Sequence, residues 1–193
     1  MKVHTKIVIT LLVFIGIIIW GYITYRADFD KKNIEDIYSA DCVVLYDKNA
    51  DHSTLQYYTD SISEIYSHNK FVSMQETDVK KQLKEIQIYI EYGVNVVVSD
   101  DCFEEAIYWA QAYYPDVNFI LLNSVPSCKG DYVLRENCIS ICDKSRVNLN
   151  DISKMESVTV DEFNEDEEDV LLGQLLKCKK GEFTGSKLCL CNH

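Results

Sequence analysis

The stretch Gly93-Val94-Asn95-Val96-Val97-Val98-Ser99-Asp100-Asp101 decides the fold of this 193-residue chain. Its centre, Val94–Val98, is almost wholly β-branched, which favours a strand. The earlier run Cys42–Tyr46 is continuously apolar, which is typical of a strand covered on both faces of the same sheet. Gly93 stands where a preceding helix can end with a positive φ, and the three residues after Val98 are of types that cap a following helix. The stretch therefore predicts a buried strand between two helices.

The same alternation of strand and helix extends to both sides of this stretch. Three further apolar runs predict strands: Cys42–Tyr46, Phe71–Met74 and Phe119–Leu122. Between the runs, apolar residues recur at steps of three and four, as on one face of a helix: Leu55, Tyr58, Ile62 and Ile65; Val79, Leu83, Ile86 and Ile90 after a capping Asp78; Phe103, Ala106, Ile107 and Ala110. Short connections between such elements are typical of right-handed βαβ units. We therefore predict an α/β three-layer sandwich with a mostly parallel sheet over residues 41–126.

The first 26 residues have a different character. Lys2 and Lys6 precede 19 uncharged residues, Ile7–Tyr25, and about 20 residues of helix cross a membrane. We predict an N-terminal transmembrane helix over residues 1–26 and a linker over 27–40. The alternative is a cleaved signal peptide, but the junction Tyr25-Arg26-Ala27-Asp28 lacks the small residues of a cleavage site. The two lysines favour a cytoplasmic N-terminus, which predicts a single-pass protein of the cell membrane with an extracytoplasmic body.

The body of the chain is strongly acidic. The whole chain has 19 basic and 31 acidic residues, and three of the basic residues precede Ala27. The remaining 16 basic residues give the body a formal net charge of −15. Such a body repels nucleic acid and anionic lipid headgroups, so we predict no nucleic-acid partner.

Order is weaker from residue 127 onward. We expect an irregular segment with cysteines and acidic residues, then a helix over Val170–Lys179 and a strand over Lys187–Cys191. Asp161–Asp169 holds seven acidic residues in nine, which we interpret as a solvated loop and the first turn of the helix, where carboxylates favour the positive dipole end. Because this run lacks the ligand spacing and central glycine of an EF-hand, it predicts no Ca²⁺ site.

The chain has eight cysteines. In an exported body they permit disulfides, and the irregular segment makes Cys128, Cys138 and Cys142 the better candidates, although free buried cysteines also pack as small hydrophobes. Cys189, Cys191 and His193 have a spacing that could converge on Zn²⁺ from one strand. A buried apolar strand explains the two cysteines equally, and we predict no metal and no cofactor.

Two segments resemble a known family. Tyr92–Val98, with a following helix that carries Phe103 and Ala106, and then Tyr114–Asn123 resemble the basic membrane protein family of extracytoplasmic substrate-binding proteins. These proteins serve ABC importers and in known cases bind nucleosides. The resemblance implies the first of the two lobes of a type 1 periplasmic-binding fold. Weaker likeness lies upstream, in Val43–Asp47 and Asp51-His52-Ser53, and downstream, in Ser157–Val160 and Val170–Gly173.

The departures from the family pattern bear on the ligand. The chain stops about where the first strand of a second lobe would begin. Thr54 stands where the family has the aromatic residue that stacks on the ligand base, and such stacking contributes about 1–3 kcal/mol. Asp100 and Asp101 stand where the family has glycine and phenylalanine, and Asn123 replaces an aspartate, whereas Asp47, Asp51 and Ser53 match. The resemblance therefore does not imply an intact nucleoside site.

Candidate ligand-binding residues follow from the predicted sheet. Parallel sheets bind ligands beyond the carboxyl ends of their strands, and the loops there supply the candidates Asp47, Asp51, Ser53, Ser99, Asp100, Asp101 and Asn123. The same residues can instead serve as helix caps and solvated loop positions. His52 beside Asp51 lacks a placed nucleophile, so no catalytic residue is predicted.

The sequence therefore favours a membrane-anchored, extracytoplasmic, non-catalytic binding domain for a small polar solute, related to ABC importer components. Its expected partners are the membrane through residues 7–25, and an ABC permease or a second copy through the uncovered face of the lobe. The alternative is a protein-interaction or structural domain, or a decayed fragment, without a small-molecule ligand.

Overall fold

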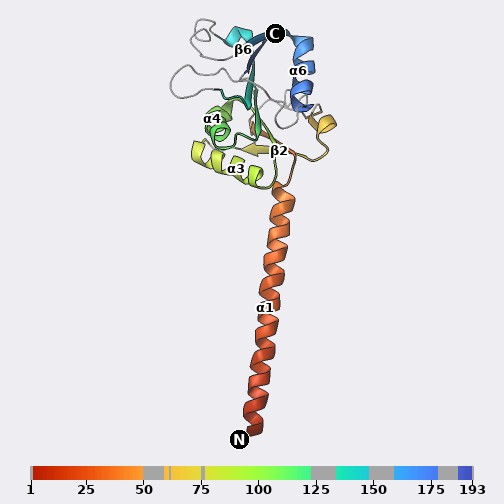
Figure 1. Cartoon of the computed structure of the whole chain (residues 1–193), viewed down its shortest axis with the longest axis vertical. Helices are drawn as coiled ribbons and strands as arrows, with labels where there is room; N and C mark the ends of the chain where they lie inside the picture. The colour runs from red at the N-terminus through yellow and green to blue at the C-terminus, as the bar shows by residue number, and fades with distance from the viewer. Residues whose placement is uncertain are drawn as a thin grey trace. The chain divides into compact units, whose positions relative to one another are not determined.

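The computed structural model describes residues 2–49, 59–60, 62–74, 77–122, 134–147, 159–177 and 187–192. The chain divides into two compact units, Met1–Ser39 and Ala40–His193. The first unit is the helix α1, Lys2–Tyr38 (Figure 1). Large apolar side chains are exposed along this helix between Val13 and Tyr25, and the side chains of residues 7–12 lie outside the described part. Within the described residues, no helix has both the length and the apolar character that crossing a membrane requires.

The second unit is built on one seven-stranded sheet. Its strands are β1 Cys42–Asp47, β2 Asn69–Met74, β3 Val96–Ser99, β4 Asn118–Leu122, β5 Cys138–Asp143, β6 Thr159–Asn164 and β7 Lys187–Asn192. The strand order is β2-β1-β3-β4-β5-β7-β6 and every pair is parallel. The four runs predicted as strands form β1 to β4, which confirms the predicted α/β fold with a parallel sheet.

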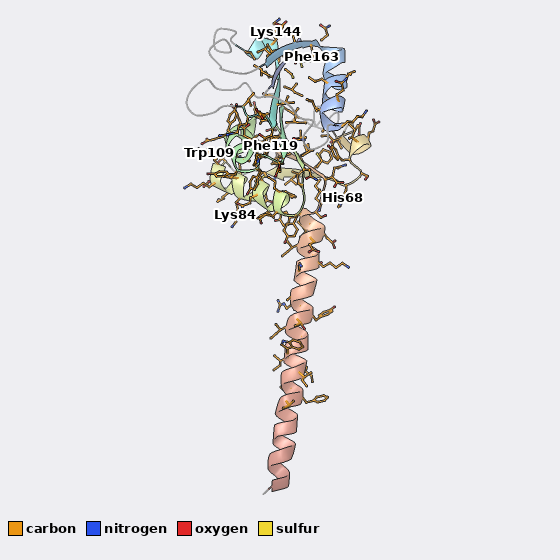
Figure 2. All side chains as sticks on the ribbon, viewed as in Figure 1. His68, Lys84, Trp109, Phe119, Lys144 and Phe163 are labelled. Atoms are coloured by element: carbon orange, nitrogen blue, oxygen red, sulfur yellow. The ribbon has the colours of Figure 1, made fainter. Side chains whose placement is uncertain are left out.

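Helices cover both faces of the sheet. Their bounds are α3 Val79–Glu91, η1 Asp101–Phe103, α4 Glu104–Tyr113, η2 Lys144–Arg146 and α6 Glu165–Lys177; residues 59–60 and 62–65 are also helical. Figure 1 shows α3 and α4 on the opposite side of the strands from α6. In the figure with side chains, Phe119 of β4 lies inside this body, whereas Trp109 of α4 lies at its outer surface (Figure 2).

The handedness of βαβ units explains which helix covers which face. Crossovers from strand to parallel strand are right-handed, so two crossovers that run in the same direction across the sheet put their helices on the same face. The connections from β1 to β2 and from β6 to β7 run in one direction, and those from β2 to β3 and from β3 to β4 run in the other. Accordingly, Ile62 and Leu172 pack in one cluster with Val44 and Val98 of the sheet. The hydroxyl of Tyr66 also donates to the carbonyl oxygen of Leu176.

Local signals in the sequence are confirmed around α3. The Asp78 side chain caps the helix by accepting a hydrogen bond from the Lys80 amide at 2.9 Å, and Gly93 has a φ of 104°. The buried face is rotated from the prediction, because Gln82 and Tyr89 are buried beside Ile86.

The third strand starts two residues later than predicted. The amide of Val94 donates to the carbonyl oxygen of Tyr89 at 3.1 Å, which closes the end of α3. Pairing with the neighbouring strands therefore begins at Val96 and continues to Ser99. This shift places Ser99 in the sheet, where the sequence had suggested a loop.

The region after residue 127 contributes three strands to the same sheet: β7, which contains the predicted strand Lys187–Cys191, and β5 and β6, which lie in segments expected to be irregular or looped. β5 lies between β4 and β7 and is almost wholly buried. The acidic run divides between β6 and α6, which starts at Glu165 and ends at Lys177 instead of spanning 170–179. Because β6 is an edge strand, exposed charges such as Glu162 guard it against pairing with another chain.

Six cysteines are described, and none of them forms a disulfide with another described cysteine. Cys138 and Cys142 are buried in β5, so the expectation that they form disulfides is wrong for a bridge between them; Cys128 lies outside the described residues. Burial raises the pKa of the Cys42 thiol to about 12, with a smaller contribution from the charge of Asp41. These buried thiols act as small apolar side chains in the core.

Candidate functional site

The candidate site lies where the direction of the sheet connections reverses. The chain leaves β1 towards β2 and leaves β3 towards β4, in opposite directions across the sheet. A strand order of 2-1-3-4-5 creates a switch point between the first and third strands, and ligands of such sheets bind there. We call the carboxyl ends of β1 and β3, residues 47 and 99–102, the switch-point site.

Four of the seven predicted ligand residues lie at this site. Asp47 is the last residue of β1, Ser99 is the last residue of β3, and Asp100 and Asp101 follow directly. The other three, Asp51, Ser53 and Asn123, lie outside the described residues, as does His52. The sheet therefore brings together residues that are more than 50 positions apart in the sequence.

Asp100 joins the two strands. Its Oδ2 accepts a hydrogen bond from the amide of Asp47 at 3.1 Å, and its Oδ1 accepts one from the amide of Cys102 at 3.0 Å. The amide of Asp100 donates to the carbonyl oxygen of Leu45 at 3.3 Å. Both carboxylate oxygens are thus used by the protein itself, and Asp100 caps η1 as the sequence predicted.

Among the described residues, only one of the two carboxylate oxygens of Asp47 accepts a hydrogen bond. Its Oδ1 accepts from the amide of Asn49 at 2.7 Å, a side-chain turn that aspartate commonly forms at a strand end. No described residue donates to its Oδ2. Within the described part of the chain, this oxygen therefore remains open to another donor.

Ser99 is fully buried, and its hydroxyl has no hydrogen-bond partner among the described residues. The register pairs Ser99 with Leu45, so both side chains project from the same face of the sheet. Asp47, two residues beyond Leu45, projects from that face as well, because side chains alternate along a strand. The hydroxyl and the carboxylate therefore lie on one face at adjacent strand ends.

Cys102 is a feature of the site that sequence reasoning missed. Its pKa is raised far above the ordinary thiol value, first by burial of the sulfur, then by its hydrogen bond to Asp100 and by the nearby carboxylates. The thiol is thus kept protonated, although the residue as a whole is exposed. This environment is the opposite of one that activates a cysteine nucleophile.

Gln82 connects the site to α3. Its Nε2 donates to the carbonyl oxygen of Cys102 at 3.3 Å, which explains the burial of an amide on the packed face of the helix. A polar residue between the apolar positions of α3 was the available signal in the sequence. Together, Asp100, Cys102 and Gln82 link β1, η1 and α3.

The same turn chemistry recurs along the carboxyl edge of the sheet. Asp143, the last residue of β5, accepts from the amide of Ser145 at 2.7 Å, as Asp47 and Asp100 accept from residues two positions on. Capping therefore accounts for part of the acidic character of this edge. Among the described residues, no group of histidine, cysteine and carboxylate side chains can hold a metal ion, and His193 lies outside them.

Comparisons with known proteins give one structural similarity to report. No family model matches the chain, and no curated protein matches it. Among solved structures, it is similar to the crystal structure of a transcriptional activator of the comK gene from Bacillus halodurans, with 14% identity and a TM-score of 0.43. The match covers 77% of this chain and 53% of that chain, so the chain spans about half of its length.

Proposed function

We propose that this chain is a non-catalytic binding module that takes a small polar solute at the switch-point site. The observation that carries the proposal is the β2-β1-β3 order, which brings Asp47 and Ser99 to the adjacent carboxyl ends of β1 and β3, where such sheets bind ligands. Among the described residues, one Asp47 carboxylate oxygen and the buried Ser99 hydroxyl have no hydrogen-bond partner, and polar groups of this kind fix the orientation of a polar ligand.

The resemblance to the basic membrane protein family supports a solute as the ligand. It rests on Tyr92–Val98 and Tyr114–Asn123, which contribute to β3 and β4 and their preceding turns. A nucleoside is disfavoured because Thr54 stands where the family has its stacking residue. In addition, Asp100 stands at the glycine position of the family pattern, and its side chain is hydrogen-bonded to the end of β1. The ligand therefore belongs to another class of polar solute.

The proposal includes a tether to the cell membrane, with the binding unit outside. Its support is the uncharged run Ile7–Tyr25 and the exposure of the large apolar side chains of α1 between Val13 and Tyr25. An ABC permease is the expected partner. Carbonate extraction of cell membranes tests the tether, and recovery of the chain in the soluble fraction would contradict it. Protease treatment of intact cells tests the orientation.

Thermal denaturation of the full chain, purified in detergent, tests the binding function. The panel is nucleosides, amino acids and polyamines at millimolar concentration. A ligand at 100 times its Kd stabilises the folded chain by about 2.7 kcal/mol, so a binding solute raises the Tm clearly. The Asp47→Ala variant should lose the shift, and the absence of a shift with every solute contradicts the proposal.

A second candidate function is a protein-interaction domain without a small-molecule ligand. It draws on a separate observation: Trp109 and Tyr113 stand one helical turn apart on α4 and are exposed by 45% and 64%. Exposed aromatic residues are enriched at protein interfaces, and a second copy of the chain is the partner proposed. Sedimentation of the wild-type chain and of a Trp109→Ala, Tyr113→Ala double variant tests it, since only the wild type should associate.

A further inference from the structure

We propose that the group bound at the switch-point site is a primary ammonium, held between the Ser99 hydroxyl and the Asp47 carboxylate, while Asp100 positions these two residues. The inference rests on the proposed binding function and names the chemical class of its ligand.

The Ser99 hydroxyl is the observation that points to a ligand. It is 0% exposed and has no partner among the described residues. An unsatisfied hydroxyl in a buried position costs free energy, and native proteins leave few such groups without a role. A donor group of a bound solute would satisfy it.

The register places this hydroxyl on the same face of the sheet as the Asp47 side chain, at the neighbouring strand end. Neighbouring strands lie about 4.8 Å apart and each residue advances about 3.3 Å along a strand. Ser99 pairs with Leu45, so the Cα atoms of Ser99 and Asp47 are on the order of 8 Å apart. A single nitrogen with hydrogen bonds of about 2.9 Å to both side chains would bridge a separation of this size.

The charges at the site select a cation. The carboxylates of Asp47 and Asp100 receive hydrogen bonds from backbone amides and from a neutral thiol, and no described lysine or arginine is paired with either. Their negative charge repels anionic solutes and attracts a positive group. An ammonium has three donors and no acceptor, which matches a carboxylate oxygen and a hydroxyl that both accept.

Asp100 affects ligand binding indirectly, by holding Asp47 in position. Both of its oxygens are occupied by the amides of Asp47 and Cys102, so it fixes the strand end and contributes charge without contacting the ligand. An Asp100→Asn substitution should weaken ammonium binding less than Asp47→Asn, because the amide oxygen can keep one of the two hydrogen bonds.

The experiment compares three solutes of equal chain length on the full chain, at constant ionic strength: 1,4-diaminobutane, 1,4-butanediol and succinate. Diaminobutane should raise the Tm, and the diol and the diacid should not. Ser99→Ala and Asp47→Asn should each weaken the apparent affinity for diaminobutane at least tenfold. Asp143→Asn removes the same charge from a matched strand end away from the switch point and should leave the affinity unchanged.

The Ser99→Ala variant gives a readout that a purely structural role would not produce. Because it removes an unsatisfied buried hydroxyl, it should keep or raise the Tm of the free chain while it loses the shift with diaminobutane. An equal shift in wild type, Ser99→Ala and Asp47→Asn would mean nonspecific attraction to an acidic protein and overturn the inference. If only butanediol shifts the Tm, the inference of an ammonium ligand is wrong and the proposed binding function still holds. If no polar solute shifts the Tm, both the inference and the proposed function are wrong.

Discussion

The amide of Asp47 donates to Oδ2 of Asp100 at 3.1 Å, so the last residue of β1 is fixed to the residue that follows β3. The two residues are 53 positions apart in the sequence. Their contact exists because the sheet places β1 and β3 side by side, and it fixes the strand ends at which the proposed ligand would bind.

Replacement of Asp100 by alanine should destabilise the second unit by about 1–2 kcal/mol. The variant removes the cap of η1 and leaves the amides of Asp47 and Cys102 without their acceptor, and loss of a cap typically costs about this much. Urea unfolding followed by tryptophan fluorescence measures the change. The control is Asp101→Ala, at the next residue, which is exposed; it should alter stability by less than about 0.5 kcal/mol. Equal effects of the two substitutions would show that the hydrogen bonds of Asp100 do not stabilise the unit.

The thiol of Cys102 should react slowly with iodoacetamide at pH 8. Its raised pKa keeps the reactive thiolate scarce, and the causes are burial, then Asp100, then the charges of Asp47 and Asp101. Asp100→Asn should lower the pKa and speed alkylation more than Asp47→Asn does, and Asp101→Asn should have the smallest effect. Mass spectrometry of the peptide that contains Cys102 measures each rate against that of glutathione, and a rate equal to glutathione in the wild type contradicts the prediction.

Local sequence signals carried the prediction of β1 to β4. Each of these strands is an apolar run next to a helix with clear periodicity, and residues such as Asp78 and Gly93 mark helix ends through chemistry that acts over a few positions. The parallel order of these strands followed from the short connections between them, because right-handed crossovers leave few arrangements.

Among the later strands, β7 was predicted from the run Lys187–Cys191, whereas β5 and β6 had weaker signals. β5 contains Cys138, Ser140 and Cys142, which dilute the apolar run, although all three are buried in the sheet. β6 is charged because it is an edge strand, and its sequence resembles that of a solvated loop. Only the pairing with β7 distinguishes the two cases, and that pairing is a long-range property.

The candidate site was predicted in part for a similar reason. The sequence placed Asp47, Ser99, Asp100 and Asp101 at strand ends, where aspartate and serine are common as caps and as ligand contacts. The difference between these roles depends on the register, which gives Asp100 two backbone donors and leaves the Ser99 hydroxyl without a partner among the residues that the structure describes. No pattern within one segment contains that information.

Stability should fall as the pH rises above about 9, and Cys42 should account for part of the loss. Its pKa is raised from 9.0 to about 12 in the folded chain, so between these values the unfolded chain releases a proton that the folded chain keeps. Stability is therefore fully present below pH 9 and falls by up to about 1.4 kcal/mol per pH unit above it.

The comparison of wild type with Cys42→Ala isolates this contribution. Urea unfolding at pH 7.5 and pH 10 should show that the variant, less stable than wild type at pH 7.5, recovers about 1 kcal/mol relative to it at pH 10. A constant difference between the two proteins at both pH values would show that this thiol does not titrate differently on unfolding.

Leu172→Ala should destabilise the second unit by about 2–5 kcal/mol, the usual cost of emptying a packed core site. Leu172 of α6 is 1% exposed and belongs to the cluster that includes Val44 and Val98, so the loss would reach the sheet built from β1 to β4. Val170→Ala changes the same helix two residues away at a position that is 59% exposed, and it should alter stability by less than about 0.5 kcal/mol. Urea unfolding monitored by both tryptophan fluorescence and circular dichroism measures the two variants, and coincident transitions are expected because one core joins α6 to the early strands. If Leu172→Ala instead produced a separate early transition with the main one unmoved, α6 and β7 would form an independent unit rather than a layer of this sheet.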